Sequence, residues 1–242
     1  MDMQNIIEYE VYGDYALFSE PGMRIGGEKT SYHLPTYEAI KGITESIYWK
    51  PSIKWIVDSV RIMNPIQTET RGVLLQKYGG GKDLAYYTYL KNVRYQVRAH
   101  LEINGNYPEL KADWNEGKHY NIAQRMVKRG GRRDIFLGTR ECQGFVVPCV
   151  FGEDRSFYDN MPGEVSYGFM YHGITYPNEA VLPEDKWKMT LNFWNAVMKT
   201  KGILEFPKPE KCPRRRVIKK MEPTPFGKGT FSGLMEFTDE EA

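Results

Sequence analysis

A lysine and a histidine stand side by side near the start of residues 116–129, a segment whose pattern predicts a helix. The first turn of a helix offers free backbone N–H groups and the positive end of the helix dipole, which attract a phosphate. Lys118 would add a charge that stabilises a negative transition state, and His119 can exchange protons near neutral pH. The same position, above Ile122 and Met126, fits a buried histidine on an apolar helix face. The residues alone favour this second interpretation over a catalytic one.

A glycine pair directly after this segment is surrounded by four cations, at Lys128, Arg129, Arg132 and Arg133. Glycine lets backbone N–H groups approach a phosphate closely, and arginine offers bidentate contacts to it. The pattern therefore favours phosphate binding over a solvated turn. Its spacing is not that of a Walker or a dinucleotide-binding motif. A second basic stretch, residues 208–220, fits an RNA contact and a solvated turn equally well.

The sequence contains no convincing metal-ligand pattern. Cys142 and Cys149 have no nearby CxxC or HxxxH partner, which argues against a zinc site. His100-Leu101-Glu102 resembles half of a deaminase signature, but no PCxxC follows, so a surface pair is the better interpretation. No cluster of carboxylates suited to magnesium is evident. Any nuclease chemistry is therefore expected to proceed without a metal or another cofactor.

The elements that must position these residues follow a strand–helix–strand order twice. Thr36 is the predicted N-cap of the first helix, which extends to Lys50 and stops at Pro51, and Gly130 ends the second helix. The alternation of apolar residues predicts strands at 7–12, 55–63, 86–103, 134–138 and 144–150, with an apolar run at 15–18 after a break at Gly13-Asp14. Between them, residues 64–83 give mixed signals around a glycine triplet at 79–81, which predicts a mobile loop.

Only strand patterns follow residue 151, at 166–175, 189–199 and 203–206. The element order predicts an α+β protein: a ferredoxin-like (RAMP/RRM-like) domain over residues 1–150, followed by a small antiparallel β-sheet domain over residues 151–221. Residues 222–242 are expected to form a flexible tail. A length of 242 residues is enough to bury a sizeable core.

Charge is distributed unevenly along the chain. The net charge is +2, yet residues 71–140 contain 14 basic and 6 acidic side chains, a local net charge of +8. This middle third fits either a polyanion site or a solvated charged face, and tyrosines among its cations tilt the balance slightly toward nucleic acid. Three cysteines, and no apolar run long enough to span a membrane, point to a cytoplasmic protein without membrane contact.

Long blocks of the sequence match one family in register. These blocks are VYGDYALF (11–18), PTYEAIKGITESIYWKP (35–51), MNPIQTETRG (63–72), KNVRYQVRAHLE (91–102), KHYNIA (118–123) and GGRRDIFLGTRECQG (130–144). Together they resemble the CRISPR-associated RAMP-superfamily proteins of type I-C systems, the pre-crRNA endoribonucleases of the Dvulg subtype. The resemblance extends to about residue 221 and is weakest after residue 151.

This resemblance implies a function and a site. The family cleaves the repeat hairpin of CRISPR precursor RNA without a metal, then stays on the 5′ handle with the other subunits of the interference complex. Its catalytic residues match Tyr48, Lys118 and His119, although Tyr48 taken alone would pass as an ordinary helix-end aromatic. The ribose 2′-OH attacks the scissile phosphate and leaves 2′,3′-cyclic phosphate and 5′-OH ends. The residues expected to bind the RNA are Arg125, Lys128, Arg129, Arg132, Arg133 and Arg140.

Two other functions are alternatives on the sequence alone. Related RAMP proteins hold the 5′ handle without cutting it, and a binding-only subunit would not need Tyr48, Lys118 and His119 together. A metal-dependent DNA nuclease ranks last, because it would need carboxylates that the sequence does not cluster. The sequence does not assign the general acid and the general base between His119 and Tyr48.

Overall fold

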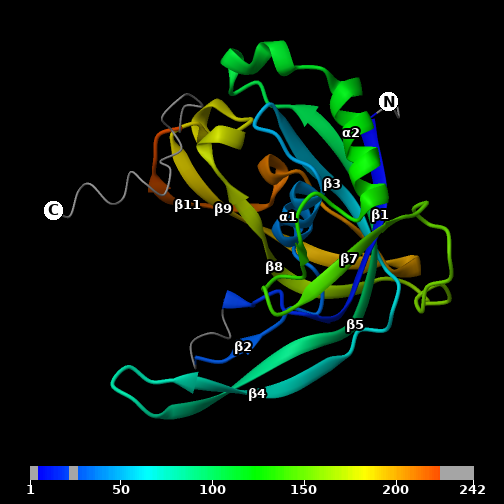
Figure 1. Ribbon diagram of the computed structural model, residues 1–242, viewed down its shortest axis with the longest axis vertical. Coiled ribbons are helices and arrows are strands. Elements are labelled where there is room, and N and C mark those ends of the chain that lie inside the picture. Colours follow the sequence, from blue (N-terminus) through cyan, green and yellow to red (C-terminus); the bar gives the residue numbers. More distant parts are fainter. Residues whose placement is uncertain (1–4, 22–26, 224–242) are drawn as a thin grey trace.

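The first part of the chain has a βαββαβ arrangement in the computed structural model, which describes residues 5–21 and 27–223 (Figure 1). Its elements are β1 (Ile6–Ala16), α1 (Tyr37–Ile47), β3 (Ile53–Ile62), β5 (Lys82–Ile103), α2 (Glu116–Arg129) and β7 (Gln143–Pro148). The strands lie in the order β3-β5-β1-β7, and each neighbouring pair is antiparallel. This connectivity is ferredoxin-like, so the predicted fold class is confirmed.

Both helices pack on the same face of this sheet. Alternate side chains of β1 point toward them: Tyr9 is fully buried, and its hydroxyl lies 2.7 Å from Thr44 Oγ1 of α1. Helix α1 begins at the predicted N-cap, where the Thr36 hydroxyl accepts a hydrogen bond from the Ala39 N–H at 3.2 Å. The helix ends at Ile47, three residues earlier than the sequence predicts.

Helix α2 has the limits that the sequence predicts. The Asn115 side chain caps its first turn by accepting from the Lys118 N–H at 2.9 Å. At the other end Gly130 adopts a left-handed conformation with φ 88°, and its N–H donates to the carbonyls of Met126 and Val127. The buried stripe of α2 contains His119, Ala123 and Val127, which sets His119 inside the protein.

Strand β1 corrects one sequence prediction. It continues through Gly13 and Asp14, where a break was expected, and Gly13 pairs with Val93 of β5. A Cβ at residue 13 would lie 2.7 Å from both the Gln143 carbonyl oxygen and a Leu137 methyl carbon. The glycine therefore permits a close approach of neighbouring backbone and does not end the strand.

A long hairpin occupies the region that gave mixed signals. Strand β4 (Thr68–Gln76) pairs with the first half of β5, and the two strands project away from the helices (Figure 1). The turn at the tip contains Gly79, Gly80 and Gly81, all with φ between 88° and 96°. Short strands β2 (Lys29–Thr30) and β6 (Ile135–Phe136) complete this part by pairing with β5 and β7.

The C-terminal strands extend the same sheet. They are β8 (Val165–Thr175), β9 (Lys188–Lys199), β10 (Ile203–Glu205) and β11 (Arg214–Lys220), and all their pairings are antiparallel. β10 pairs with β3 on one side and β9 on the other, so within the described residues eleven strands form one sheet. β11 lies in the basic stretch where no strand was predicted. The division at residue 150 stays a prediction.

Short 3-10 turns connect these elements: η3 (Pro108–Asp113), η4 (Pro177–Glu179), η5 (Pro183–Asp185), η6 (Thr200–Gly202) and η7 (Pro209–Lys211). The core continues from α1 into the C-terminal strands, because the Tyr37 ring stacks on His172 of β8 with centroids 4.2 Å apart. Of the predicted tail, residues 224–242 lie outside the described residues.

Candidate active site

Tyr48 is fixed where α1 turns into the following loop. It is the C-cap residue of α1, and its N–H donates to the Thr44 carbonyl at 3.1 Å. Its own carbonyl accepts from the Trp55 indole N–H at 2.6 Å, which ties the helix end to β3. The side chain is buried and points toward the N-terminus of α2, where its hydroxyl meets His119. Residues far apart in sequence therefore converge.

His119 uses both of its ring nitrogens. Nδ1 lies 2.8 Å from the Tyr48 hydroxyl, and Nε2 lies 2.8 Å from the backbone carbonyl oxygen of Asp113. A carbonyl oxygen only accepts, so Nε2 carries the hydrogen, and in the neutral ring Nδ1 accepts from the Tyr48 O–H. With a side-chain exposure of 0%, His119 reaches a substrate only through Tyr48 or after a local rearrangement.

Asp113 holds Lys118 close to this pair. Its carboxylate accepts from the Lys118 ammonium and from the Ser52 hydroxyl, the latter at 2.6 Å, and lies 3.4 Å from His119 Nε2. The hydrogen bond from Lys118 is the main reason why the pKa of Asp113 lies below its usual value. No sequence pattern pointed to Asp113 or Ser52, because both lie in turns between the longer elements and only the fold brings them together.

The Tyr48 hydroxyl keeps its proton at neutral pH. Burial raises its pKa above the ordinary value of 10.0, and the negative charge of Asp113 raises it further, while Arg132 opposes both effects. The site therefore presents a neutral O–H donor backed by an imidazole acceptor, next to a lysine ammonium. Such a set can move a proton and stabilise an anion.

The glycine–arginine loop packs against the end of α1. The backbone N–H groups of Arg132 and Arg133 both donate to the Ser46 carbonyl, at 3.2 and 3.1 Å. This places the loop beside the residue pair that precedes Tyr48. Arg129, Arg132 and Arg133 also border an open groove of about 720 Å³, whose lining includes exposed aromatic rings from β1 and β7. The groove therefore combines positive charge with surfaces on which bases can stack.

The remaining predicted RNA-binding residues are more scattered. Arg125 and Lys128 are exposed on α2, and Arg140 is exposed in the turn between β6 and β7. None of the three lines the groove. Within the described residues no ion pair is present for any of the six predicted RNA-binding cations. In this part of the chain no acidic side chain pairs with them.

The sequence motif around His100 forms a separate charged cluster on the outer side of β3 and β5. His100 Nδ1 lies 2.8 Å from Asp58 and its Nε2 lies 3.3 Å from Glu102, while Lys54 and Lys208 also pair with Glu102. Hydrogen bonds from the His100 ring to the carboxylates of Asp58 and Glu102 raise the pKa of His100 to about 9. His100 is therefore a charged structural partner, consistent with a surface pair.

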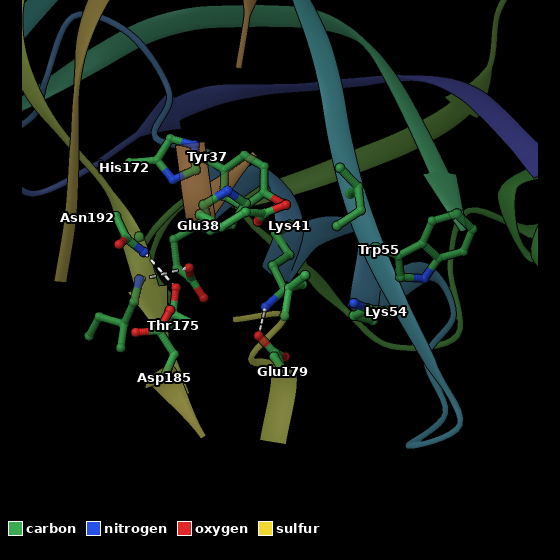
Figure 2. A pocket seen from close by; sticks show the side chains of 16 residues that line it. Tyr37, Glu38, Lys41, Lys54, Trp55, His172, Thr175, Glu179, Asp185 and Asn192 are labelled. Carbon is green, nitrogen blue, oxygen red and sulfur yellow. Dashed lines mark hydrogen bonds and ion pairs between the residues drawn. The ribbon is translucent and has the colours of Figure 1, made fainter. Parts of the chain in front are cut away.

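Another cavity lies between α1 and the C-terminal strands (Figure 2). Its volume is only about 30 Å³, enough for water but not for a nucleotide. Lys41 and Glu179 form an ion pair beside it, and Glu38 and Asn192 contribute polar groups (Figure 2). The cavity belongs to the packing between α1 and β8–β9.

The described part of the chain shows no group of three or more His, Cys, Asp or Glu side chains arranged to hold a metal ion. Its helices are also too short or too polar to cross a bilayer. The expectation of metal-free chemistry stays a prediction for experiment.

Comparison with known proteins assigns the family. A family model described as CRISPR-associated protein (Cas_Cas5), of the Cas5d type, matches residues 6–204. The chain belongs to the Cas5d family. The resemblance seen in the sequence is thereby confirmed, and the other comparisons agree with it.

Two curated relatives of this Cas5d-family chain are named CRISPR pre-crRNA endoribonuclease Cas5d. The protein of Mannheimia succiniciproducens is 30% identical over 151 residues, covering 53% of this chain and 65% of that protein. The protein of Thermus thermophilus is 28% identical over 151 residues, covering 59% and 63%. The matched part thus spans slightly less than two thirds of each relative.

Solved structures are also similar to this Cas5d-family chain. A crystal structure of a CRISPR-associated protein superposes with a TM-score of 0.73 at 31% identity, covering 88% of this chain and 97% of that chain. A functionally uncharacterized protein from Streptococcus mutans gives a TM-score of 0.71 at 32% identity with the same coverage. The fold is therefore shared along most of the chain.

Proposed function

We propose that this protein is a metal-independent endoribonuclease that recognises the CRISPR repeat hairpin and cleaves precursor RNA. It leaves 2′,3′-cyclic phosphate and 5′-OH ends and then stays on the 5′ handle of the crRNA, as a cytoplasmic subunit of the type I-C interference complex. The observation that carries the proposal is the hydrogen bond between Tyr48 and His119 with Lys118 alongside. The names of the two curated relatives support the same activity.

The geometry suggests how the three residues divide the work. The 2′-OH next to the scissile phosphate gives its proton to the Tyr48–His119 pair and attacks phosphorus, and the 5′-oxygen of the next nucleotide takes a proton from the same pair as the P–O5′ bond breaks. The Tyr48 O–H contacts the reacting atoms, and His119 Nδ1 exchanges protons with it. Lys118 stabilises the negative charge on the phosphoryl oxygens once Asp113 releases it. Arg132 and its neighbours hold the phosphates of the flanking RNA.

The direct test is cleavage of end-labelled repeat RNA by the purified protein in excess EDTA. Tyr48→Phe and His119→Ala should each lower the single-turnover rate by about 10²–10⁴-fold, the usual effect of a positioned proton-transfer group. Affinity for the hairpin should change little, because neither side chain carries a fixed charge. Replacing only the scissile 2′-OH by hydrogen should abolish cleavage by the unmodified protein while binding persists.

Other results would refute this mechanism. Cleavage that disappears in EDTA and returns with magnesium would require a metal. A substrate that lacks the 2′-OH but is still cut at the same phosphate would require water as the nucleophile. A His119→Ala protein that cuts at the original rate would make His119 a packing residue.

One observation favours the binding-only alternative: His119 is fully buried and both of its nitrogens are already hydrogen-bonded. A subunit that only holds the 5′ handle would bind repeat RNA without cutting it, and Tyr48→Phe and His119→Ala would then change neither binding nor product. The assay above distinguishes the two functions directly.

A further inference from the structure

An aromatic pocket lies beside the candidate active site. Its volume is about 350 Å³, within the range of small-molecule sites. The residues that line it come from the segments that follow α1, β5, β8 and β11 and from the first residue of β3. They are Trp49, Ile53, Asn104, Tyr107, Tyr176, Pro177, Asn178, Glu179 and Met221. None of these residues has a role in the proposed chemistry.

Two rings in this aromatic pocket keep much of their surface uncovered. Trp49 is 39% exposed and Tyr176 is 38% exposed, although both rings lie in a concave site. Uncovered aromatic surface is costly in water and suits a flat partner that stacks on it. Because the site is concave, a flat partner could contact both Trp49 and Tyr176.

Hydrogen bonds hold the walls of the pocket in place. The Asn104 amide donates to the carbonyls of Pro51 and Asn178, at 3.2 and 3.1 Å. Tyr107 is tied across the pocket, since its hydroxyl accepts from the Asn178 amide. Asn106 also donates to the Asn178 carbonyl at 3.1 Å. The pocket is therefore formed before a ligand arrives, which lowers the entropic cost of binding.

The lining selects a neutral ligand with polar edges. Glu179 is the only charged residue among the described residues that line the pocket. Its carboxylate pairs with Lys41 of α1, which is not part of this lining (Figure 2). Aromatic faces combined with carboxamides match the flat face and the hydrogen-bonding edge of a nucleobase. A phosphate would find no cation in the lining.

The pocket shares its chain segments with the candidate active site. Trp49 directly follows Tyr48, and Tyr107 directly precedes η3, whose last residue is Asp113. Since consecutive Cα atoms are about 3.8 Å apart, a base stacked on Trp49 lies close to the Tyr48 backbone. We propose that the aromatic pocket binds one unpaired nucleobase next to the scissile phosphate, an inference that rests on the proposed function.

The test removes the ring and the base separately and then together. Trp49→Ala should weaken binding of uncleavable 2′-deoxy repeat RNA by about 5- to 150-fold, the range for one stacked base. An abasic nucleotide at one position beside the cleavage site should cause a similar loss in the unmodified protein. The two changes combined should cost no more than either alone, because they remove the same contact. Trp187→Ala removes an exposed tryptophan outside the lining and should leave affinity unchanged.

Tyr176→Leu provides a second variant, and matching thermal melts show whether each variant is folded. If folded Trp49→Ala and Tyr176→Leu both bind RNA as the unmodified protein does, the inference is overturned. It is also overturned if the abasic position and Trp49→Ala weaken binding additively, or if Trp49→Ala impairs only assembly with protein subunits.

Photocrosslinking separates this inference from the proposed function. Repeat RNA with 4-thiouridine placed beside the cleavage site should crosslink to Trp49 or Tyr176, as mapped by mass spectrometry. Suppose that the protein cleaves repeat RNA, that no such crosslink forms, and that Trp49→Ala binds RNA with unchanged affinity. This result would refute base binding in the aromatic pocket and leave the proposed nuclease activity standing. A crosslink with the predicted abasic effect, in a protein that cuts no repeat RNA, would support the pocket and refute the nuclease.

Discussion

Asp113 contacts two of the three groups on which the proposed chemistry depends. Its carboxylate neutralises Lys118, while its backbone carbonyl holds Nε2 of His119. Rotation of this partly exposed side chain would release the lysine without disturbing the imidazole. If Lys118 binds the scissile phosphate as we propose, the carboxylate competes with that phosphate for the lysine.

Asp113→Asn is therefore expected to increase affinity for repeat RNA by about 2- to 5-fold, the equivalent of one exposed ion pair. The substitution removes the charge and keeps the shape, so the His119 contact survives. Filter binding with uncleavable RNA measures the effect, and Glu109→Gln in the same turn is the matched control. A lower cleavage rate at unchanged affinity would instead mean that the carboxylate orients His119.

His100 should make stability depend on pH in the alkaline range. Its pKa in the folded protein is about 9, above the ordinary 6.5, so the charged form stabilises the fold. This contribution is complete below about pH 6.5 and is lost as the pH rises through 9. His100→Gln should therefore cost about 1–3 kcal/mol at pH 6 and much less at pH 10. Urea unfolding at both pH values checks this, and equal losses would contradict it.

The sequence predicted the site residues to different degrees. Lys118 and His119 stood out because a cation and a titratable ring open a helix, yet without the family resemblance a packed histidine was the better explanation. Tyr48 emerged only through the family resemblance, since an aromatic residue at a helix end is ordinary. Asp113 and Ser52 could not be predicted, because 61 residues separate them and only the fold joins them.

At the level of elements, the glycine–arginine loop should control the electrostatic part of RNA binding. Neutralising Arg129, Arg132 and Arg133 should reduce the slope of log K against log salt concentration by roughly 0.7–0.9 for each phosphate that the variant no longer binds. The cleavage rate at saturating RNA should change less than affinity. A triple variant of the exposed basic residues of β11, Arg214, Arg216 and Lys219, serves as the comparison. If the loop variant keeps the same slope, the loop does not contact the RNA phosphates.

Helices were easier to predict than strands in this chain. Their caps, Thr36 and Gly130, act locally and are visible in sequence. Strand β1 was divided at Gly13 because glycine usually marks a break, whereas here it allows close contact with Leu137. Strand β11 was missed because its burial pattern is almost entirely exposed, so the apolar alternation that reveals a strand is absent.

Across the whole molecule, Arg61 joins the two predicted parts. It lies in β3, is 2% exposed, and donates to the Glu153, Asp154 and Lys201 carbonyls and to the Asp159 carboxylate at 2.6 Å. The sheet and the core cluster are also continuous across residue 150. Unfolding should therefore occur in one transition that involves both parts.

Arg61→Met should lower the free energy of unfolding by about 3–5 kcal/mol, because it leaves the partners of a buried charge unsatisfied. For a chain of this size the melting temperature should fall by about 6–20 °C. Calorimetry measures both quantities, with Arg216→Met as the exposed control. Two separate transitions in the unmodified protein would contradict a cooperative sheet and favour independent domains.

The contact between His119 and the backbone of residue 113 has an evolutionary consequence. Every amino acid supplies a main-chain carbonyl, so no point mutation at residue 113 can remove this acceptor. The hydroxyl of Tyr48, by contrast, is lost in a single exchange to phenylalanine. The backbone path of the loop therefore keeps the hydrogen on Nε2 of His119, whichever side chain residue 113 carries. Lineages that abandon cutting are expected to do so through residues 48, 118 and 119, while the main-chain acceptor at residue 113 is retained whatever its side chain.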